Sequence, residues 1–131
     1  DINGCPQVPQ SDKKYMASFL VEDTRVVLLS SYSSGDVISN FVQAIGDSAL
    51  HHIALTVPDI AVAMNQLIHL FPSLKQITQL AHDEYMAQVF FQVDGNPKII
   101  ELVERSHNFQ KTFTCSNIRQ LTEGERLNWQ D

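Results

Sequence analysis

The sequence predicts an α+β protein whose curled mixed sheet is built from paired βαβββ modules. Three observations indicate this class: a strand that leads directly into a helix at residues 51–71, three strand-like runs that follow this helix, and a hairpin pattern opening with Tyr-Met-Ala that occurs twice. A sheet that carries its helix on one face leaves the other face available for a site. We therefore expect residues 50–106 to form one complete module.

Apolar residues alternate with small or polar ones along the strand that opens this module. The alternation places Ile53 and Leu55 on one face of the strand and His52 on the other. Asp59 then occupies an N-cap position, and the apolar residues after it recur at the spacing of an amphipathic helix. We expect this helix to pack on Ile53 and Leu55, so that His52 faces away from it.

Runs rich in valine, leucine and aromatic residues predict the other strands. They span residues 15–22, 24–32, 74–80, 86–93, 98–104 and 111–117. Further helices are expected at residues 33–46, where Gly46 is the stop signal, and at residues 118–130. Gly124 weakens the last helix by about 1 kcal/mol relative to alanine.

An internal repeat relates two of the predicted hairpins. The segment YMASFLVEDTRVVLLSS overlays YMAQVFFQVDGNPKIIELVERS and aligns Leu28 with Glu101. A weaker overlay of FQKTFTCSNIRQL on HHIALTVPDIAVAM aligns Gln110 with His52. The chain therefore contains one complete module and the pieces of a second.

Length and repeat together predict how the chain is divided. We expect an irregular arm over residues 1–14 and a single domain over residues 15–131. The second, partial module would combine residues 15–46 with residues 107–131. It would close within one chain, or between two chains as a domain-swapped homodimer.

Composition and charge restrict the kinds of partner that we expect the protein to bind. With 44% hydrophobic and 18% charged residues the chain is globular, and it lacks the apolar run of roughly 18 residues that a membrane helix needs. A net charge of -6 without a basic cluster argues against nucleic acid. Cys5 and Cys115 are expected to be unpaired thiols in a reducing compartment, which predicts a soluble, cytoplasmic protein without membrane contact.

The sequence resembles the vicinal oxygen chelate superfamily, also called the glyoxalase/bleomycin resistance/dioxygenase fold. The segments that carry the likeness, within residues 15–106, are ASFLVEDTRVVLLSS, VISNFVQAIGDSALHHIALTVPDIAVAM and KIIELVERS, and they look most like hydroxyphenylpyruvate dioxygenases and methylmalonyl-CoA epimerases. The resemblance implies a glyoxalase-like fold whose sheet forms a cup, with metal ligands pointing inward from the first and last strands of a module. His52 and Glu101 match two such positions of the complete module. In the partial module, Leu28 stands at the position equivalent to Glu101.

The chemistry of these side chains leaves alternatives open. Glu101 stands among apolar neighbours, and a buried carboxylate needs a metal, another cation or a raised pKa. Alternatively, Glu101 lies at a sheet edge and reaches water, Lys98 or Arg105. His52 is either a ligand or a hydrogen-bonded interior histidine. The other histidines are expected in unrelated roles: His51 as a packing residue, His69 as a solvated or interface residue, and His82 and His107 in loops.

Two functions follow. In the first, His52, Glu101 and Gln110 hold a divalent metal (Fe, Mn, Ni, Co or Zn), and Glu101 also takes part in catalysis; the protein is then a dioxygenase, lyase or isomerase acting on a small oxygenated substrate. A second chain could supply the third ligand in place of Gln110. In the second, a metal-free cup binds and sequesters a small molecule. Its lining residues would be Val26, Leu28, Phe90 and Val103.

Overall fold

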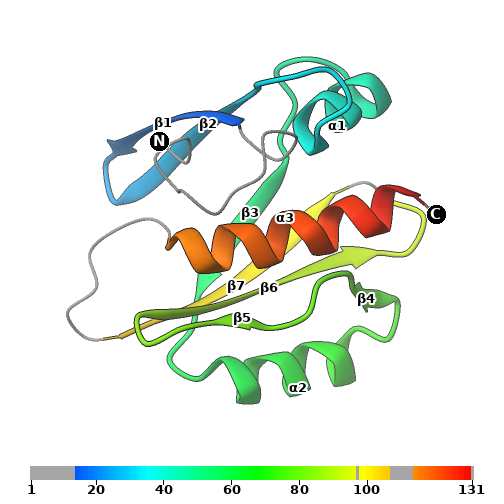
Figure 1. Cartoon of the computed structure of the whole chain (residues 1–131). Helices are drawn as coiled ribbons and strands as arrows, with labels where there is room; N and C mark the ends of the chain where they lie inside the picture. Colours follow the sequence, from blue (N-terminus) through cyan, green and yellow to red (C-terminus); the bar gives the residue numbers. More distant parts are fainter. Residues whose placement is uncertain (1–13, 97, 107–113, 131) are drawn as a thin grey trace. The chain divides into compact units, whose positions relative to one another are not determined.

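The computed structural model describes residues 14–96, 98–106 and 114–130 (Figure 1). Contacts divide the chain into two compact units, Asp1–Ala49 and Leu50–Asp131. In this described part, no helix has the length and apolar character needed to cross a bilayer.

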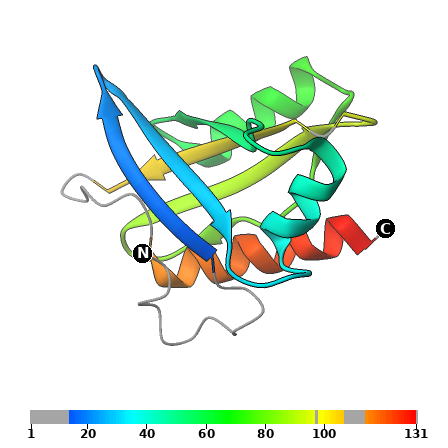
Figure 2. The same ribbon diagram turned by 90° about the horizontal axis from the view of Figure 1, so that it is seen from above.

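The first unit consists of a hairpin and a helix. Strand β1 (Lys14–Val21) pairs antiparallel with β2 (Thr24–Ser31), as the two long blue and light-blue arrows of Figure 2 show. Helix α1 (Val37–Ile45) packs beside β2 and begins at Asp36, whose carboxylate accepts a hydrogen bond from the Ser39 backbone N–H. These elements confirm the predicted hairpin and the helix that follows it.

The second unit contains the predicted module and a C-terminal helix. Its sheet has the strand order β3-β7-β6-β4, with β5 also paired to β6. Strands β3 and β7 are parallel, and the other pairs are antiparallel. The elements are β3 (His52–Thr56), α2 (Ile60–Leu70), β4 (Leu74–Gln76), β5 (Ala81–His82), β6 (Met86–Val93), β7 (Ile99–Arg105) and α3 (Cys115–Gln130).

The two helices of this unit lie on opposite faces of its sheet (Figure 1). Alternate residues of β6 and β7 consequently belong to different cores. The core beneath α2 contains Ile60, Leu74, Val89, Phe91 and Leu102. The core beneath α3 contains Ala81, Phe90, Ile99 and Leu121. The sheet face covered by α3 is the one averted from α2, and His52 was predicted to lie on the face averted from that helix.

The start of α2 is fixed from two sides. Asp59 accepts a hydrogen bond from the Val62 backbone N–H at 3.1 Å, as its predicted N-cap role requires. Glu104, on β7, accepts one from the Ile60 backbone N–H at 2.9 Å. Two carboxylates therefore satisfy amide groups that the first helical turn leaves unpaired.

The predicted packing of β3 against the helix is wrong. Ile53 and Leu55 remain 53% and 48% exposed, and α2 packs on β7 and β4. The reason is strand order: β3 is the outermost strand of this sheet, beside β7. The alternation identified the faces of the strand but could not reveal its place in the sheet.

The predicted strand over residues 74–80 is shorter than expected. Pairing along β4 stops at Gln76, and a separate short strand, β5, follows. Between them, the Thr78 hydroxyl accepts a hydrogen bond from the Phe90 backbone N–H at 2.9 Å. A side chain thus replaces a backbone partner at this point of the sheet.

The predicted strand over residues 111–117 is also wrong where it can be checked. Residues 115–117 form the first turn of α3, and residues 111–113 lie outside the described part. The Thr114 hydroxyl accepts a hydrogen bond from the Asn117 backbone N–H at 3.2 Å, which is the geometry of an N-cap. The assignment of residues 107–131 to a second module with residues 15–46 stays a prediction.

Gly124 lies inside α3 because the helix passes very close to the chain at Thr78. A Cβ atom at position 124 would stand 2.8 Å from the Thr78 methyl carbon and 3.2 Å from its Cα. The glycine therefore allows a close approach between α3 and the segment that joins β4 to β5, at the cost in helix propensity expected from the sequence.

Candidate functional site

His52 and Glu101 meet on the α3 face of the sheet. Parallel pairing of β3 with β7 sets His52 opposite Ile99 and Ala54 opposite Glu101. The His52 Nε2 atom lies 3.0 Å from Glu101 Oε2, and Glu101 is only 2% exposed. Since β7 runs between β3 and β6, the alternative of an edge position for Glu101 is wrong.

The other oxygen of Glu101 is held by an amide. Gln88, on β6, donates from Nε2 to Glu101 Oε1 at 2.6 Å. Asn117, on α3, donates from Nδ2 to Gln88 Oε1 at 3.0 Å and to the Met86 carbonyl at 3.1 Å. Both acceptors face the Asn117 NH₂ group, which fixes which way that amide is turned. Asn117 Oδ1 has no hydrogen-bond partner within the described residues.

His51 extends the same network toward the far end of α3. Its Nδ1 atom lies 2.8 Å from His52 Nδ1, so one of these atoms donates and the other accepts. Its Nε2 atom forms a short contact with Glu125 Oε1, and Glu125 is 2% exposed. The prediction that His51 is a packing residue is therefore corrected: its ring joins Glu125 to His52.

Phe90 encloses the two histidines on one side. Its ring centroid lies 5.2 Å from that of His52 and 6.4 Å from that of His51. Phe90 and the neighbouring β7 residue Val103 are both buried. Of the four residues predicted to line a ligand cup, Phe90 therefore lies beside His52, and Val103 lies on β7, the strand that carries Glu101.

The remaining predicted residues lie elsewhere. Val26 and Leu28 belong to β2 in the first unit, and Leu28 is exposed. His69 is exposed on α2, in agreement with a solvated role, whereas His82 lies on β5 and not in a loop. Gln110 and His107 fall outside the described residues.

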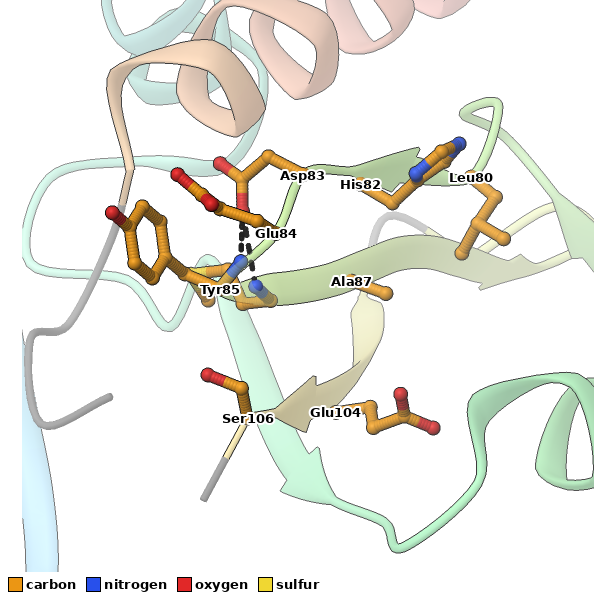
Figure 3. Close-up of a pocket in the computed structure, with 9 residues that line it drawn as sticks. Leu80, His82, Asp83, Glu84, Tyr85, Ala87, Glu104 and Ser106 are labelled. Carbon is orange, nitrogen blue, oxygen red and sulfur yellow. Dashed lines mark hydrogen bonds between the residues drawn. The ribbon is translucent and has the colours of Figure 1, made fainter. Parts of the chain in front are cut away.

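A shallow pocket of about 360 Å³ opens at the other end of the sheet (Figure 3). Its lining includes His82, Asp83, Tyr85 and Glu104, and it contains neither His52 nor Glu101. Burial raises the pKa of Asp83, but hydrogen bonds from Thr114 and from the backbone N–H groups of Tyr85 and Met86 outweigh burial and hold it below its ordinary value. Those two backbone bonds, the dashed lines of Figure 3, brace the turn that leads into β6.

The donor chemistry of His52 and Glu101 fits two positions of a divalent-metal ligand set. Imidazole nitrogen and carboxylate oxygen together suit ions such as Fe²⁺, Mn²⁺ and Zn²⁺. Each side chain also has an outer partner, His51 for His52 and Gln88 for Glu101, as metal ligands usually do. The described residues contain no group of three His, Cys, Asp or Glu side chains arranged around one ion. The predicted third ligand, Gln110, is not among them.

Cys115 does not carry a free thiol. It is disulfide-bonded at the first residue of α3, so the prediction of an unpaired thiol there is wrong. Cys5, the other cysteine of the chain, lies outside the described residues.

Comparison with known proteins identifies the fold. No family model and no curated protein matches the sequence. Among solved structures, the chain is similar to a hypothetical protein from Bacillus halodurans, with a TM-score of 0.60 and 18% identity over 77% of this chain and 73% of that one. It is also similar to a mutant of 4-hydroxymandelate synthase from Streptomyces coelicolor, with a TM-score of 0.63 and 18% identity over 79% of this chain and 38% of the synthase.

These likenesses agree with the topology found in the second unit. The α+β class predicted from the sequence is present, and the predicted βαβββ order is found with its second strand replaced by the two short strands β4 and β5. The chain therefore has a glyoxalase-like α+β fold.

Proposed function

We propose that the protein is a divalent-metal-dependent enzyme of the glyoxalase/dioxygenase type that acts on a small oxygenated substrate. The observation that carries this proposal is the close pair of potential ligand atoms, Nε2 of the partly buried His52 and Oε2 of the buried Glu101, on neighbouring strands. Burying a carboxylate beside an imidazole is costly unless a charge partner or strong hydrogen bonds compensate it, and functional sites often contain such pairs. The structural likeness to 4-hydroxymandelate synthase supports the same class.

His52 and Glu101 would hold the metal, with Gln110 or a residue of a second chain as a further ligand. A bound divalent ion supplies Lewis-acid polarisation of a substrate oxygen. Around it, Gln88 holds the Glu101 carboxylate in one orientation, and the Phe90 ring lies beside the His52 ring. Oxygen and nitrogen donors of this kind suit Fe, Mn, Ni, Co or Zn.

A further proposal concerns the partners. We propose a small molecule as the partner, without nucleic acid, and a homodimer if a second chain completes the ligand set. The cytoplasmic location rested on unpaired thiols, and the Cys115 disulfide removes that basis, because disulfides persist mainly in oxidising compartments.

Metal binding tests the function most simply. Isothermal titration of the purified protein with Mn²⁺ should give about one ion per chain, or per completed site in a dimer. His52→Ala removes a ligand nitrogen and Glu101→Gln replaces an anionic carboxylate by a neutral amide, so each should weaken binding by at least about 100-fold. His69→Ala, an exposed histidine on α2, is the matched control and should bind as the wild type does.

Two results would contradict the proposal. The first is a wild-type protein that binds none of Mn²⁺, Co²⁺ and Zn²⁺, which would favour the metal-free binding protein. The second is unchanged affinity in both His52→Ala and Glu101→Gln, which would locate the metal elsewhere.

A further inference from the structure

Among the described side chains of helix α3, Asn117, Thr122 and Glu125 are the buried polar ones, and Asn117 and Glu125 contact the network around His52 and Glu101. Asn117 and Glu125 are 0% and 2% exposed, and apolar Ile118 and Leu121 lie between them. Asn117 and Glu125 are eight positions apart, which corresponds to about 12 Å along a helix axis. Buried polar groups need specific partners. Here the partners are the neighbours of Glu101 and His52.

Asn117 controls Glu101 through Gln88. A glutamine amide can turn either its NH₂ group or its oxygen toward a neighbour. Because the Asn117 NH₂ donates to Gln88 Oε1, the NH₂ group of Gln88 is directed to Glu101. Without Asn117, this orientation of the Gln88 amide loses the hydrogen bond at its oxygen and keeps the one to Glu101.

Glu125 controls His52 through His51. To offer its Nε2 lone pair to a metal as a neutral ring, His52 must carry its proton on Nδ1. That N–H faces His51 Nδ1, which must then accept it, and this requires the proton of His51 to be on Nε2. The Glu125 carboxylate contacts that Nε2 atom and favours this tautomer.

We propose that α3 is the positioning element of the candidate metal site, with Asn117 and Glu125 as its positioning residues. Asn117 orients Glu101 through Gln88, and Glu125 sets the tautomer and ring orientation of His52 through His51. The inference rests on the proposed function for its metal-binding consequence. Loss of such outer partners typically weakens metal affinity about 10- to 100-fold.

Metal affinity provides the first test. Asn117→Leu removes the donor at similar volume, and Glu125→Met removes the acceptor; each should weaken Mn²⁺ binding by about 10- to 100-fold. Glu125→Gln should restore most of the affinity, because its amide oxygen still accepts from His51 Nε2–H. Ile118→Ala, a buried apolar position on the same helix face, is the control: it should lower the melting temperature but change the affinity less than about twofold.

Two NMR measurements test the same proposal without metal. The side-chain amide protons of Gln88 should exchange slowly in the wild type and at least about tenfold faster in Asn117→Leu, but not in Ile118→Ala. A nitrogen–nitrogen scalar coupling between the His51 and His52 rings should be present in the wild type and Glu125→Gln and lost in Glu125→Met. These readouts report orientation and do not follow from a general loss of stability.

The outcomes separate this inference from the proposed function. If the wild type binds metal and Asn117→Leu and Glu125→Met bind it equally well, the positioning role of α3 is refuted while the metal site stands. If the wild type binds no metal, the proposed function fails, and unchanged amide exchange and ring coupling in the two variants would refute the positioning role as well.

Discussion

Asp36 illustrates how a single side chain can stabilise a helix start. Burial raises the pKa of Asp36, but hydrogen bonds from the backbone N–H groups of Ser39, Ser33 and Tyr32 and from the Ser31 hydroxyl outweigh it and hold the pKa below its ordinary value of 3.8. A carboxyl group whose folded pKa is depressed stabilises the protein above its unfolded pKa and loses this contribution as the pH falls below it.

Asp36→Ala should therefore destabilise the protein by about 1 to 2 kcal/mol at neutral pH. Urea unfolding followed by circular dichroism should show this difference shrinking as the pH is lowered below about 3.8. Asp23→Asn, in the exposed turn of the hairpin, is the control. A difference that stayed constant at the most acidic pH would contradict the role of the ionised carboxylate.

Gly124 gives a second prediction for a single residue. Alanine is favoured over glycine inside a helix by about 1 kcal/mol, but here its Cβ would meet the Thr78 side chain and backbone. Overpacking typically costs about 1 to 3 kcal/mol, so Gly124→Ala should lower the free energy of unfolding despite the better propensity. Ser116→Ala, exposed on the same helix, should change it by less than about 0.5 kcal/mol. A stabilised Gly124→Ala protein would show that α3 can shift away from Thr78.

The sequence predicted the two central site residues but not those that hold them. His52 and Glu101 were found because the resemblance to the vicinal oxygen chelate superfamily matches them to ligand positions, and strand alternation places both on the face averted from α2. His51 and Glu125 are 74 positions apart, and Asn117 and Gln88 are 29 apart. No local pattern links residues at such separations, so these partnerships appear only in the folded chain.

At the scale of elements, strand position decides which leucine supports α2. Leu102 is buried on β7 in the core beneath α2, whereas its partner Leu55 on β3 is half exposed. Leu102→Ala should cost about 2 to 5 kcal/mol, and Leu55→Ala about 1 kcal/mol or less. Chemical denaturation of both variants checks the order. Equal losses would mean that β3 is covered in solution.

The elements predicted correctly are those with strong local signals. Asp59 caps α2, and the hairpins β1–β2 and β6–β7 follow the repeated pattern in the sequence. The start of α3 was mispredicted because the β-branched and aromatic residues before Cys115 resemble a strand. The Thr114 cap outweighs that resemblance, and threonine at this spacing was a signal that could have been used.

At the scale of the whole molecule, the disulfide predicts how the chain responds to reduction. Titration of the denatured, unreduced protein with a thiol reagent should detect no free thiol, because the chain has only two cysteines and Cys115 is bonded. Reduction, or Cys115→Ser, should lower the free energy of unfolding by about 2 to 5 kcal/mol. Detection of two free thiols would contradict the bond.

His52 and Glu101 are proposed to bind one divalent metal together. Crystals soaked anaerobically in Mn²⁺ and measured for anomalous scattering would locate that ion. The proposal predicts an anomalous peak within about 2.0 to 2.6 Å of both His52 Nε2 and a Glu101 oxygen, with the two side chains parted from their direct contact. An unoccupied site in which Nε2 and Oε2 remain hydrogen-bonded at full Mn²⁺ concentration would contradict it.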